Sequence, residues 1–275
     1  MTATSPTAPT HPVAAPLWRG DRPPAATRLS ASLTFLERGL LKLRRVPEQA
    51  ADAVLIPIIF TVLFTYLFGG ALAGSTGDYL HFLLPGTLVM TALLVTVYAG
   101  AGLNADKAAG LLDRFRSMPT WGLAHLVGAL LTEAVRALAA CTIVIAVGLL
   151  MGFRPDGGVT GVVSAVAVVV VFSVSLAWVW AAIGLVARSA AAVSTLSFLV
   201  QFPLTFASNV FVDPKTMPGW LHAFVDVNPV SLLATNVRHL MAGTATVANV
   251  GWVLLAAAAL TAVFAPLTAR LYRAA

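Results

Sequence analysis

The sequence DKAAGLLDRFRSMP, residues 106–119, is a compact charged segment set between two long apolar runs. Within it, Leu111, Leu112 and Phe115 recur at helical spacing beside Asp113 and Arg114. This spacing predicts a short amphipathic helix over the segment, with one face on the apolar part of the protein and the other face available to a partner. The proline at the end of the segment closes it, because proline cannot continue a helix.

The composition on both sides of this segment indicates a membrane protein that crosses the bilayer several times. Hydrophobic residues make up 59% of the chain and charged residues only 10%, which a soluble domain does not show. The formal net charge of +6 does not point to nucleic acid. Most lysines and arginines flank apolar runs, where the orientation of the protein in the membrane explains them.

Six apolar runs are long enough to cross the hydrocarbon core of a bilayer, near residues 52–73, 82–103, 124–151, 159–187, 190–211 and 249–269. Six crossings put both termini on the same side of the membrane. On that side lie thirteen lysines and arginines, whereas three lie on the other. Cytoplasmic segments carry the excess of positive charge. We therefore expect a protein of the bacterial plasma membrane, with both termini and residues 106–119 on its cytoplasmic side.

Two different segments precede the first run. Residues 1–28 are rich in Ala, Pro and Thr and lack the apolar core of a signal peptide, so we expect a disordered cytoplasmic tail. Residues 29–45 carry leucines every three or four positions, with Arg38, Lys42 and Arg45 on the opposite face. This pattern predicts an amphipathic helix on the inner membrane surface, although a helix packed on a soluble domain would show the same stripe. Residues 29–275 are then one transmembrane domain.

Glu133 and Arg136 are ionisable residues inside the third apolar run. Three residues apart, they share a helical face and can pair with each other or with a neighbouring helix. An ion pair at membrane depth is a functional candidate. The alternative is a structural pair that fixes helix packing at the cytoplasmic mouth.

The fifth run contains polar and helix-breaking residues, which must be buried in protein or line a wet cavity. The following residues 212–244 are apolar, and their prolines divide them into short helices that we expect to dip back into the outer leaflet as a re-entrant hairpin. We predict an outer gate from these two parts, made of Gln201, Pro203, Asn209, Phe211, Met217, Trp220, Asn228 and Pro229.

Residues 106–119 resemble the first cytoplasmic loop of ABC type-2 exporter membrane subunits, specifically the daunorubicin-resistance-type permeases, with the pattern D-x-x-x-G-x-x-D-R-F-R-S-x-P. The matching residues are Asp106, Gly110, Asp113, Arg114, Phe115, Arg116, Ser117 and Pro119. In that family the segment is the coupling helix that docks into a separate ATPase subunit. Residues 208–221, SNVFVDPKTMPGWL, look like the family's outer hairpin. The other interpretation of residues 106–119 is an ordinary solvated loop that obeys the positive-inside rule.

The resemblance implies a permease that pairs with a second copy or with a related permease. Two ATPase subunits would bind ATP and Mg²⁺, and the cargo would be a hydrophobic or amphipathic drug, secondary metabolite or lipid. The chain has no phosphate-binding G-x-x-x-x-G-K-[ST] pattern of its own. It also lacks the common zinc-site and serine-hydrolase patterns. We therefore expect no enzyme activity and no cofactor in this chain.

Two other classes of protein would share the apolar composition. A passive channel or ion-coupled transporter needs no docking helix, and a proton-coupled carrier would carry more carboxylates inside its spans than Glu133. A membrane scaffold for a biosynthetic complex is the third possibility. The lone Cys141 leaves no intrachain disulfide in any of these classes and is expected to be a buried thiol.

Overall fold

The computed structural model describes residues 27–45, 47–118 and 120–274, with the backbone alone for residues 47–53 and 116. Over these residues the regular elements are all helical, as the sequence predicts. They are α1 (Arg28–Arg45), α2 (Pro47–Ala73), α3 (Thr76–Ala108), α4 (Leu111–Arg116), α5 (Ala124–Leu150), α6 (Gly158–Val186), α7 (Ala190–Phe206), the 3-10 turn η1 (Pro214–Thr216), α8 (Gly219–Val227), α9 (Pro229–Met241) and α10 (Val247–Ala274). The tail predicted over residues 1–28 lies outside the described residues, apart from its last two.

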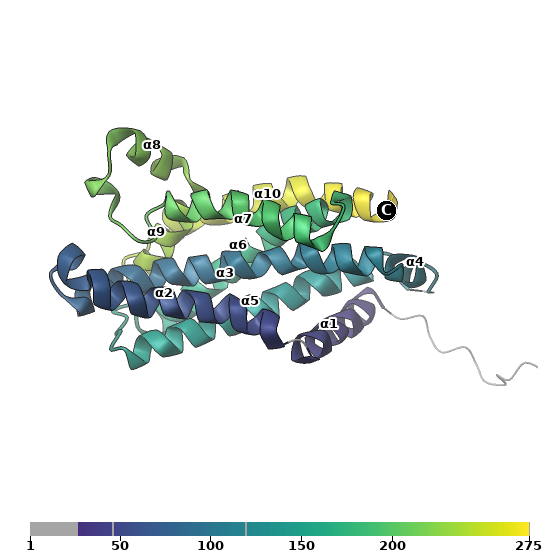
Figure 1. Cartoon of the computed structure of the whole chain (residues 1–275), viewed down its shortest axis with the longest axis horizontal. Helices are drawn as coiled ribbons and strands as arrows, with labels where there is room; N and C mark the ends of the chain where they lie inside the picture. The colour runs from purple at the N-terminus through teal and green to yellow at the C-terminus, as the bar shows by residue number, and fades with distance from the viewer. Residues whose placement is uncertain (1–26, 46, 119, 275) are drawn as a thin grey trace, which may run out of the picture.

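The long helices run along one common direction (Figure 1). Helix α4, helix α1 and the C-terminus lie at one end of the bundle, and α8 lies at the other. Helix α3 is the central element, because it contacts α2, α5, α6 and α7 and is the most buried of the long helices. The main hydrophobic core forms around it and includes Cys141, whose predicted burial is confirmed.

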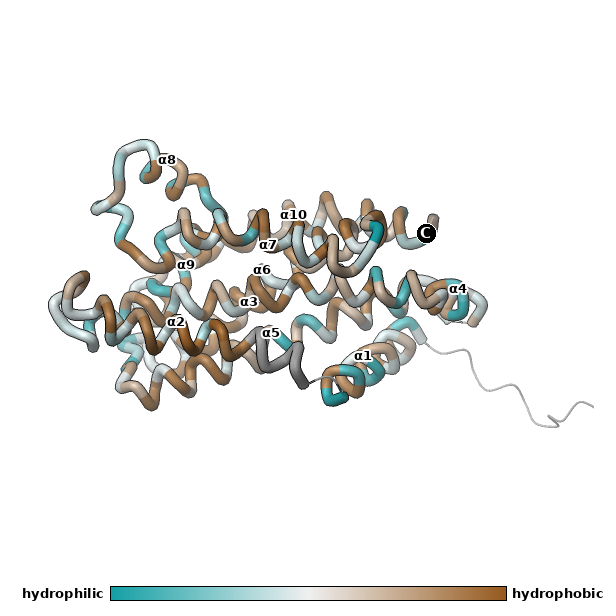
Figure 2. The backbone as a smooth tube through the Cα atoms, viewed as in Figure 1, coloured by the Kyte–Doolittle hydropathy of each residue, from teal (hydrophilic) through white to brown (hydrophobic). Residues whose placement is uncertain are grey.

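Five described helices are long and apolar enough to cross a membrane, and the sequence predicts six crossings. These candidate spans are Val54–Ala73, Thr76–Ala108, Ala124–Leu150, Gly158–Val186 and Val247–Ala274. Hydrophobic residues gather along them (Figure 2). Helix α7, which covers the remaining predicted run, has 17 residues and ends before residue 211. Its end is fixed where the Asn228 side chain donates to the carbonyl oxygens of Leu204 and Ala207.

The segment at residues 106–119 is not one helix. Asp106 belongs to the last turn of α3, and the following helix α4 covers only Leu111–Arg116. The break is at Gly110, whose φ of 67° is left-handed, a conformation that glycine adopts without steric cost. The predicted boundary is therefore corrected at its start. Pro119, at its end, lies outside the described residues.

Helices α3 and α6 cross in direct backbone contact at Gly100 and Gly184. A Cβ atom on Gly184 would lie 2.2 Å from the carbonyl oxygen of Gly100. Small residues allow such an approach between helices in a membrane, where van der Waals packing contributes much of the association. The crossing holds the C-terminal part of α6 against the central helix.

Helix α1 packs on the first half of α5 through two glycines. A Cβ atom on Gly128 of α5 would lie 2.4 Å from Cβ of Phe35, and one on Gly39 of α1 would lie 2.1 Å from Oγ1 of Thr132. The helix predicted over residues 29–45 is present, and one of its faces lies against the bundle.

Candidate functional site

Helix α4 is amphipathic, with its apolar residues turned to the bundle. The Leu112 side chain is 2% exposed and packs with Leu103, Leu126 and Leu185. Asp113 and Arg114 are exposed on the other face, and the Ser117 hydroxyl donates to the carbonyl oxygen of Arg114 at the end of the helix. The short helix therefore has a packed side and a charged side.

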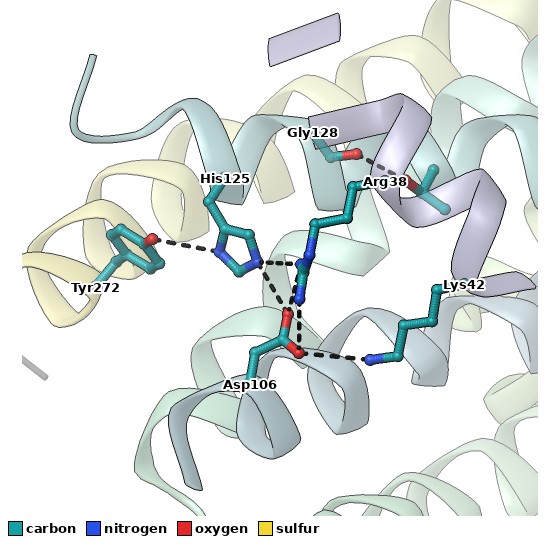
Figure 3. A network of polar contacts seen from close by, with 7 residues as sticks. Arg38, Lys42, Asp106, His125, Gly128 and Tyr272 are labelled. Atoms are coloured by element: carbon teal, nitrogen blue, oxygen red, sulfur yellow. Dashed lines mark hydrogen bonds and ion pairs between the residues drawn. The ribbon is translucent and has the colours of Figure 1, made fainter. Parts of the chain in front are cut away.

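Asp106 does not share that charged side, because its carboxylate is only 11% exposed and is the centre of an ionic network (Figure 3). Its oxygens lie 3.1 Å from Nη1 of Arg38, 3.5 Å from Nζ of Lys42 and 3.0 Å from Nε2 of His125. A buried carboxylate costs free energy unless such partners compensate for the lost water. Asp106 thus binds α1 and α5 to the end of α3.

His125 extends this network to the C-terminal helix. Its Nδ1 lies 3.3 Å from the hydroxyl of Tyr272 in α10. The two contacts fit a neutral imidazole in which Nε2–H donates to Asp106 and Nδ1 accepts from the tyrosine. Four helices, α1, α3, α5 and α10, therefore meet through side chains that Figure 3 shows turned toward one another.

Phe115 connects α4 to this network. Its ring centroid lies 4.8 Å from that of His125 and 5.1 Å from that of Phe35, and the Arg38 guanidinium carbon lies 4.9 Å from it. These are ordinary distances for aromatic and cation–π contacts. Phe115 therefore links α4 directly to His125 and Arg38 of the ionic network.

Two further residues of the same α3 turns hold the end of α6, and the sequence did not single them out as site residues. The Asn104 amide donates to the carbonyl oxygens of Gly184 and Ala187, at 2.9 and 2.8 Å. Lys107 Nζ lies 2.7 Å from the carbonyl oxygen of Leu185. The last carbonyl oxygens of a helix have no hydrogen-bond donors within the helix. For α6, the side chains of Asn104 and Lys107 in α3 are the donors. The sequence signal was only that Asn104 is a polar residue at the end of an apolar run.

Glu133 and Arg136 pair with each other inside the protein. Nη1 of Arg136 lies 3.0 Å from both carboxylate oxygens of Glu133, and the guanidinium lies over the ring of Tyr98 at 4.8 Å. The pair and the Asp106 network line the same cavity of about 270 Å³ between α1, α3 and α5. The structure thus brings together two groups of residues that the sequence treats separately.

A second, apolar cavity lies beside α3, between it and helices α2 and α7. It has a volume of about 310 Å³ and is lined from α2, α3 and α7, with Phe60, Phe198, Phe202 and Phe206 among its walls. Tyr98 borders both this cavity and the one that holds Glu133. We call the apolar cavity between α2, α3 and α7 the aromatic groove. Beyond it, the ring of Phe206 stacks on that of Phe211 at 5.0 Å.

The residues predicted for the outer gate separate into two groups. Gln201, Asn209, Phe211 and Asn228 are buried. Pro203 is exposed on α7, Pro229 is exposed at the start of α9, Met217 is partly exposed and Trp220 on α8 is 75% exposed. Asn209 and Asn228 therefore lie at the end of α7, whereas Gln201 donates to the carbonyl oxygen of Leu93 in the middle of α3 and Trp220 is separated from them by its exposure.

Arg238 organises this outer cluster, although it was not among the residues predicted for the gate. Its guanidinium donates to the carbonyl oxygens of Phe82, Asn209 and Val210 at 2.9, 2.7 and 3.1 Å. Burial lowers the pKa of Arg238 to about 10, so the group remains charged at neutral pH. Arg238 thus donates to backbone oxygens of Asn209 and Val210, which follow the end of α7 and belong to no helix.

Among the residues that the structure describes, no cluster of His, Cys, Asp and Glu could hold a metal ion. The chemistry at the α4 end is ionic and aromatic contact between helices. This arrangement can transmit a mechanical change.

Comparison with known proteins gives the family. Residues 31–242 match the ABC-2 type transporter family. The chain is 51% identical over 254 residues to the daunorubicin resistance ABC transporter permease protein DrrB1 of Streptomyces coeruleorubidus, covering 92% of this chain and 90% of that one. It is 25% identical over 216 residues to the probable doxorubicin resistance ABC transporter permease protein DrrC of Mycobacterium tuberculosis, covering 78% of each. A putative transport permease, ycf38, of Porphyra purpurea is 25% identical over 215 residues, covering 76% of this chain and 73% of that one.

These matches confirm the family predicted from residues 106–119. They extend over both the α4 end of the bundle and the outer cluster, because the matched residues run from α1 to the end of α9. The chain belongs to the ABC-2 type transporter family, in which its relatives are named as permease subunits.

Proposed function

We propose that this chain is the membrane subunit of an ATP-driven exporter that moves a hydrophobic or amphipathic drug out of the cytoplasm or the inner leaflet. The observation that carries the proposal is the two-sided α4. Its Leu112 and Phe115 are anchored in the bundle, whereas Asp113 and Arg114 are exposed at the end of the molecule. A docking helix needs both properties, since it must bind a partner and transmit the partner's movement.

The partner is a separate ATPase subunit, in two copies, which binds ATP and Mg²⁺. The coupling surface consists of Gly110, Asp113, Arg114, Arg116, Ser117 and Pro119, and Phe115 acts from the packed side of α4. Asp106 acts behind this surface, because its carboxylate holds α3 to α1 and α5. Charged residues at such a surface set register and partner choice.

The chain crosses the membrane six times in this proposal, with α7 as the fifth crossing. Its 17 residues extend over about 25 Å at 1.5 Å per residue, and 17 is the lower limit of the usual length for a spanning helix. Residues 212–241 form the outer re-entrant hairpin. Both termini and α4 are cytoplasmic, as the distribution of Lys and Arg favours.

The working unit contains a second permease, either a second copy or a related chain, and the cargo passes between the two. In support, α2 and α7 leave large apolar side chains exposed, such as Leu63, Leu67, Phe198 and Leu199. The aromatic groove lies between these helices. Its walls suit an aromatic, amphipathic cargo, because ring contacts add to the burial of apolar area. Relatives named for daunorubicin and doxorubicin resistance support a drug of this type.

The cargo reaches the groove from the inner leaflet beside Tyr98 and the Glu133–Arg136 pair. On the outside, the path closes at Asn209 and Phe211. The experiment that tests the whole proposal is reconstitution of the chain in proteoliposomes with an ATPase subunit that co-purifies with it. We expect ATP-dependent movement of doxorubicin, which stops when the ATPase is omitted. Movement that continues without the ATPase would instead support a passive or ion-coupled transporter.

A further inference from the structure

The cavity between α1, α3 and α5 contains more cationic groups than its two carboxylates neutralise. Arg38, Lys42 and Arg136 line it, together with Asp106 and Glu133. These three cations and two carboxylates leave one positive charge over. The cavity is therefore suited to an anion, provided that some of the cationic donors are not already engaged.

Arg136 has such donors. Only its Nη1 contacts Glu133, at 3.0 Å from each oxygen. Its Nε is buried and has no hydrogen-bond partner among the described residues. A guanidinium has five N–H donors in a fixed fork, which matches the geometry of phosphate oxygens. The ring of Tyr98 lies against one face of this guanidinium, with 4.8 Å between the ring centroid and the guanidinium carbon.

Lys42 contributes from the α1 wall. Its side chain is 51% exposed, and its ionic contact among the described residues is the 3.5 Å approach to Asp106, which is long. Asp106 is held more closely by Arg38 and His125. The Lys42 ammonium can therefore turn toward a ligand without leaving the carboxylate unpaired.

The level of the cavity in the membrane indicates where the anion comes from. Ala137, next to Arg136, packs in one cluster with Tyr98 and with Val54, and in the sequence Val54 opens the uncharged apolar run of α2, two positions after Asp52. Arg136 thus lies where the chain passes from the aqueous side into hydrocarbon, which is the level of lipid head groups. Small and apolar residues, including Gly39, Leu43 and Gly102, make up other parts of the wall.

We propose that this cavity binds the phosphate of an inner-leaflet phospholipid, with Arg136 and Lys42 as its ligands. The assignment to the inner leaflet rests on the orientation proposed above, whereas binding itself does not depend on orientation or transport. The volume of about 270 Å³ suits a head group and lies just below the range common for drug-sized ligands.

The test is native mass spectrometry of the full chain in detergent, titrated with phosphatidylglycerol. Lys42→Gln should weaken binding at least fivefold, whereas Arg44→Gln, which changes an exposed cation of α1 outside the cavity, should leave it within twofold. The double variant Glu133→Gln with Arg136→Gln should weaken binding at least tenfold without leaving a buried unpaired charge.

Glu133→Gln alone separates ligand binding from a structural role. It frees Nη1 of Arg136 and removes a negative charge from the cavity, so phosphatidylglycerol should bind more tightly, by about threefold or more. A merely structural ion pair predicts no gain. Equal weakening by Lys42→Gln and Arg44→Gln would show general attraction to α1 and would overturn the site.

Three competitors complete the test. Diacylglycerol should not bind at the concentrations that saturate phosphatidylglycerol, and inorganic phosphate at millimolar concentration should not displace the lipid. Equal binding of diacylglycerol would refute phosphate recognition, and displacement by inorganic phosphate would refute the lipid as its source. Displacement by doxorubicin that Glu133→Gln abolishes would assign the cavity to the cargo and contradict the proposal.

Discussion

Nε2 of His125 lies 3.0 Å from the carboxylate of Asp106, and the aromatic ring of Phe115 packs on the same imidazole at 4.8 Å. The imidazole therefore touches both the buried anion at the end of α3 and a large side chain of α4. Helix α4 is six residues long, so packing against its neighbours, more than its own hydrogen bonds, fixes its position. Movement of α4 on the ATPase would reach α1, α5 and α10 through this contact.

Replacing Asp106 by Asn should loosen this junction. Asn keeps the size of the side chain but loses the charge that holds Arg38 and Lys42. We expect the free energy of unfolding to fall by about 1–2 kcal/mol, since hydrogen bonds to charged groups are strong but these two cations are partly exposed. Drug-stimulated ATP hydrolysis should fall more than basal hydrolysis does. Both are measured on the purified complex.

The control for this variant is Asp156→Asn, which changes an exposed aspartate between α5 and α6. It should alter stability by less than about 0.5 kcal/mol. If Asp106→Asn behaves like this control in both assays, the network has no role in coupling.

Reversing both charges on the exposed side of α4, Asp113→Lys with Arg114→Glu, tests docking. The packed side, with Leu112 and Phe115, is untouched, so the protein should insert and keep its melting temperature. Because like charges brought together at an interface are strongly unfavourable, recovery of the ATPase in a pull-down should fall at least tenfold. Asp156→Lys at the opposite end is the matched charge reversal, and it should retain the ATPase. Full recovery with the double variant would remove α4 from the interface.

The sequence predicted the helical bundle and the family well, because both depend on local features. Apolar runs of spanning length identify membrane helices whatever their neighbours, and the match at residues 106–119 is contiguous along the chain. The same locality explains the boundary error at Asp106. Its carboxylate looked like part of a docking surface because its partner Arg38 is 68 residues away, a contact that no spacing in one sequence reveals.

Arg238 and Asn104 show the same limit. Each is a polar residue beside an apolar run, and each serves backbone oxygens of another helix or loop. Which carbonyls lack partners depends on where helices end in space, and the sequence does not contain that information directly. Pairing of Glu133 with Arg136 was predictable because three residues of spacing place both on one face.

Labelling with an impermeant thiol reagent tests the orientation. In a Cys141→Ala background, single cysteines at Ser117 and Asp156 should label from opposite sides of the membrane, with Asp156→Cys accessible from outside. Both positions are exposed. Gly157, nearby, is unsuitable because a Cβ atom there would lie 2.6 Å from the carbonyl oxygen of Leu240. Labelling of both positions from one side would refute the six-span topology.

The outer cluster gives the last prediction. The Asn209 amide donates to Oγ1 of Thr235 in α9 at 2.7 Å, and its backbone oxygen accepts from Arg238. Oδ1 of Asn209 is buried without a partner among the described residues. Asn209→Leu removes the side-chain contact between the end of α7 and α9, and it keeps the backbone contact to Arg238. Transport should change several-fold, whereas assembly with the second permease and basal ATP hydrolysis should remain within twofold.

Thr235→Val removes the same hydrogen bond from the other side and is the matched variant. If the bond sets the position of the outer gate, the two single variants should change transport to a similar extent, and the double variant should change it little further. Such non-additivity is the expected behaviour of two residues that act through one contact. Independent, additive effects would mean that the Asn209 side chain acts through something other than its hydrogen bond to Thr235. Loss of the permease pair in Asn209→Leu, with no separate effect on transport, would show that Asn209 only holds helices together, and the gate assigned to this end of α7 would be wrong.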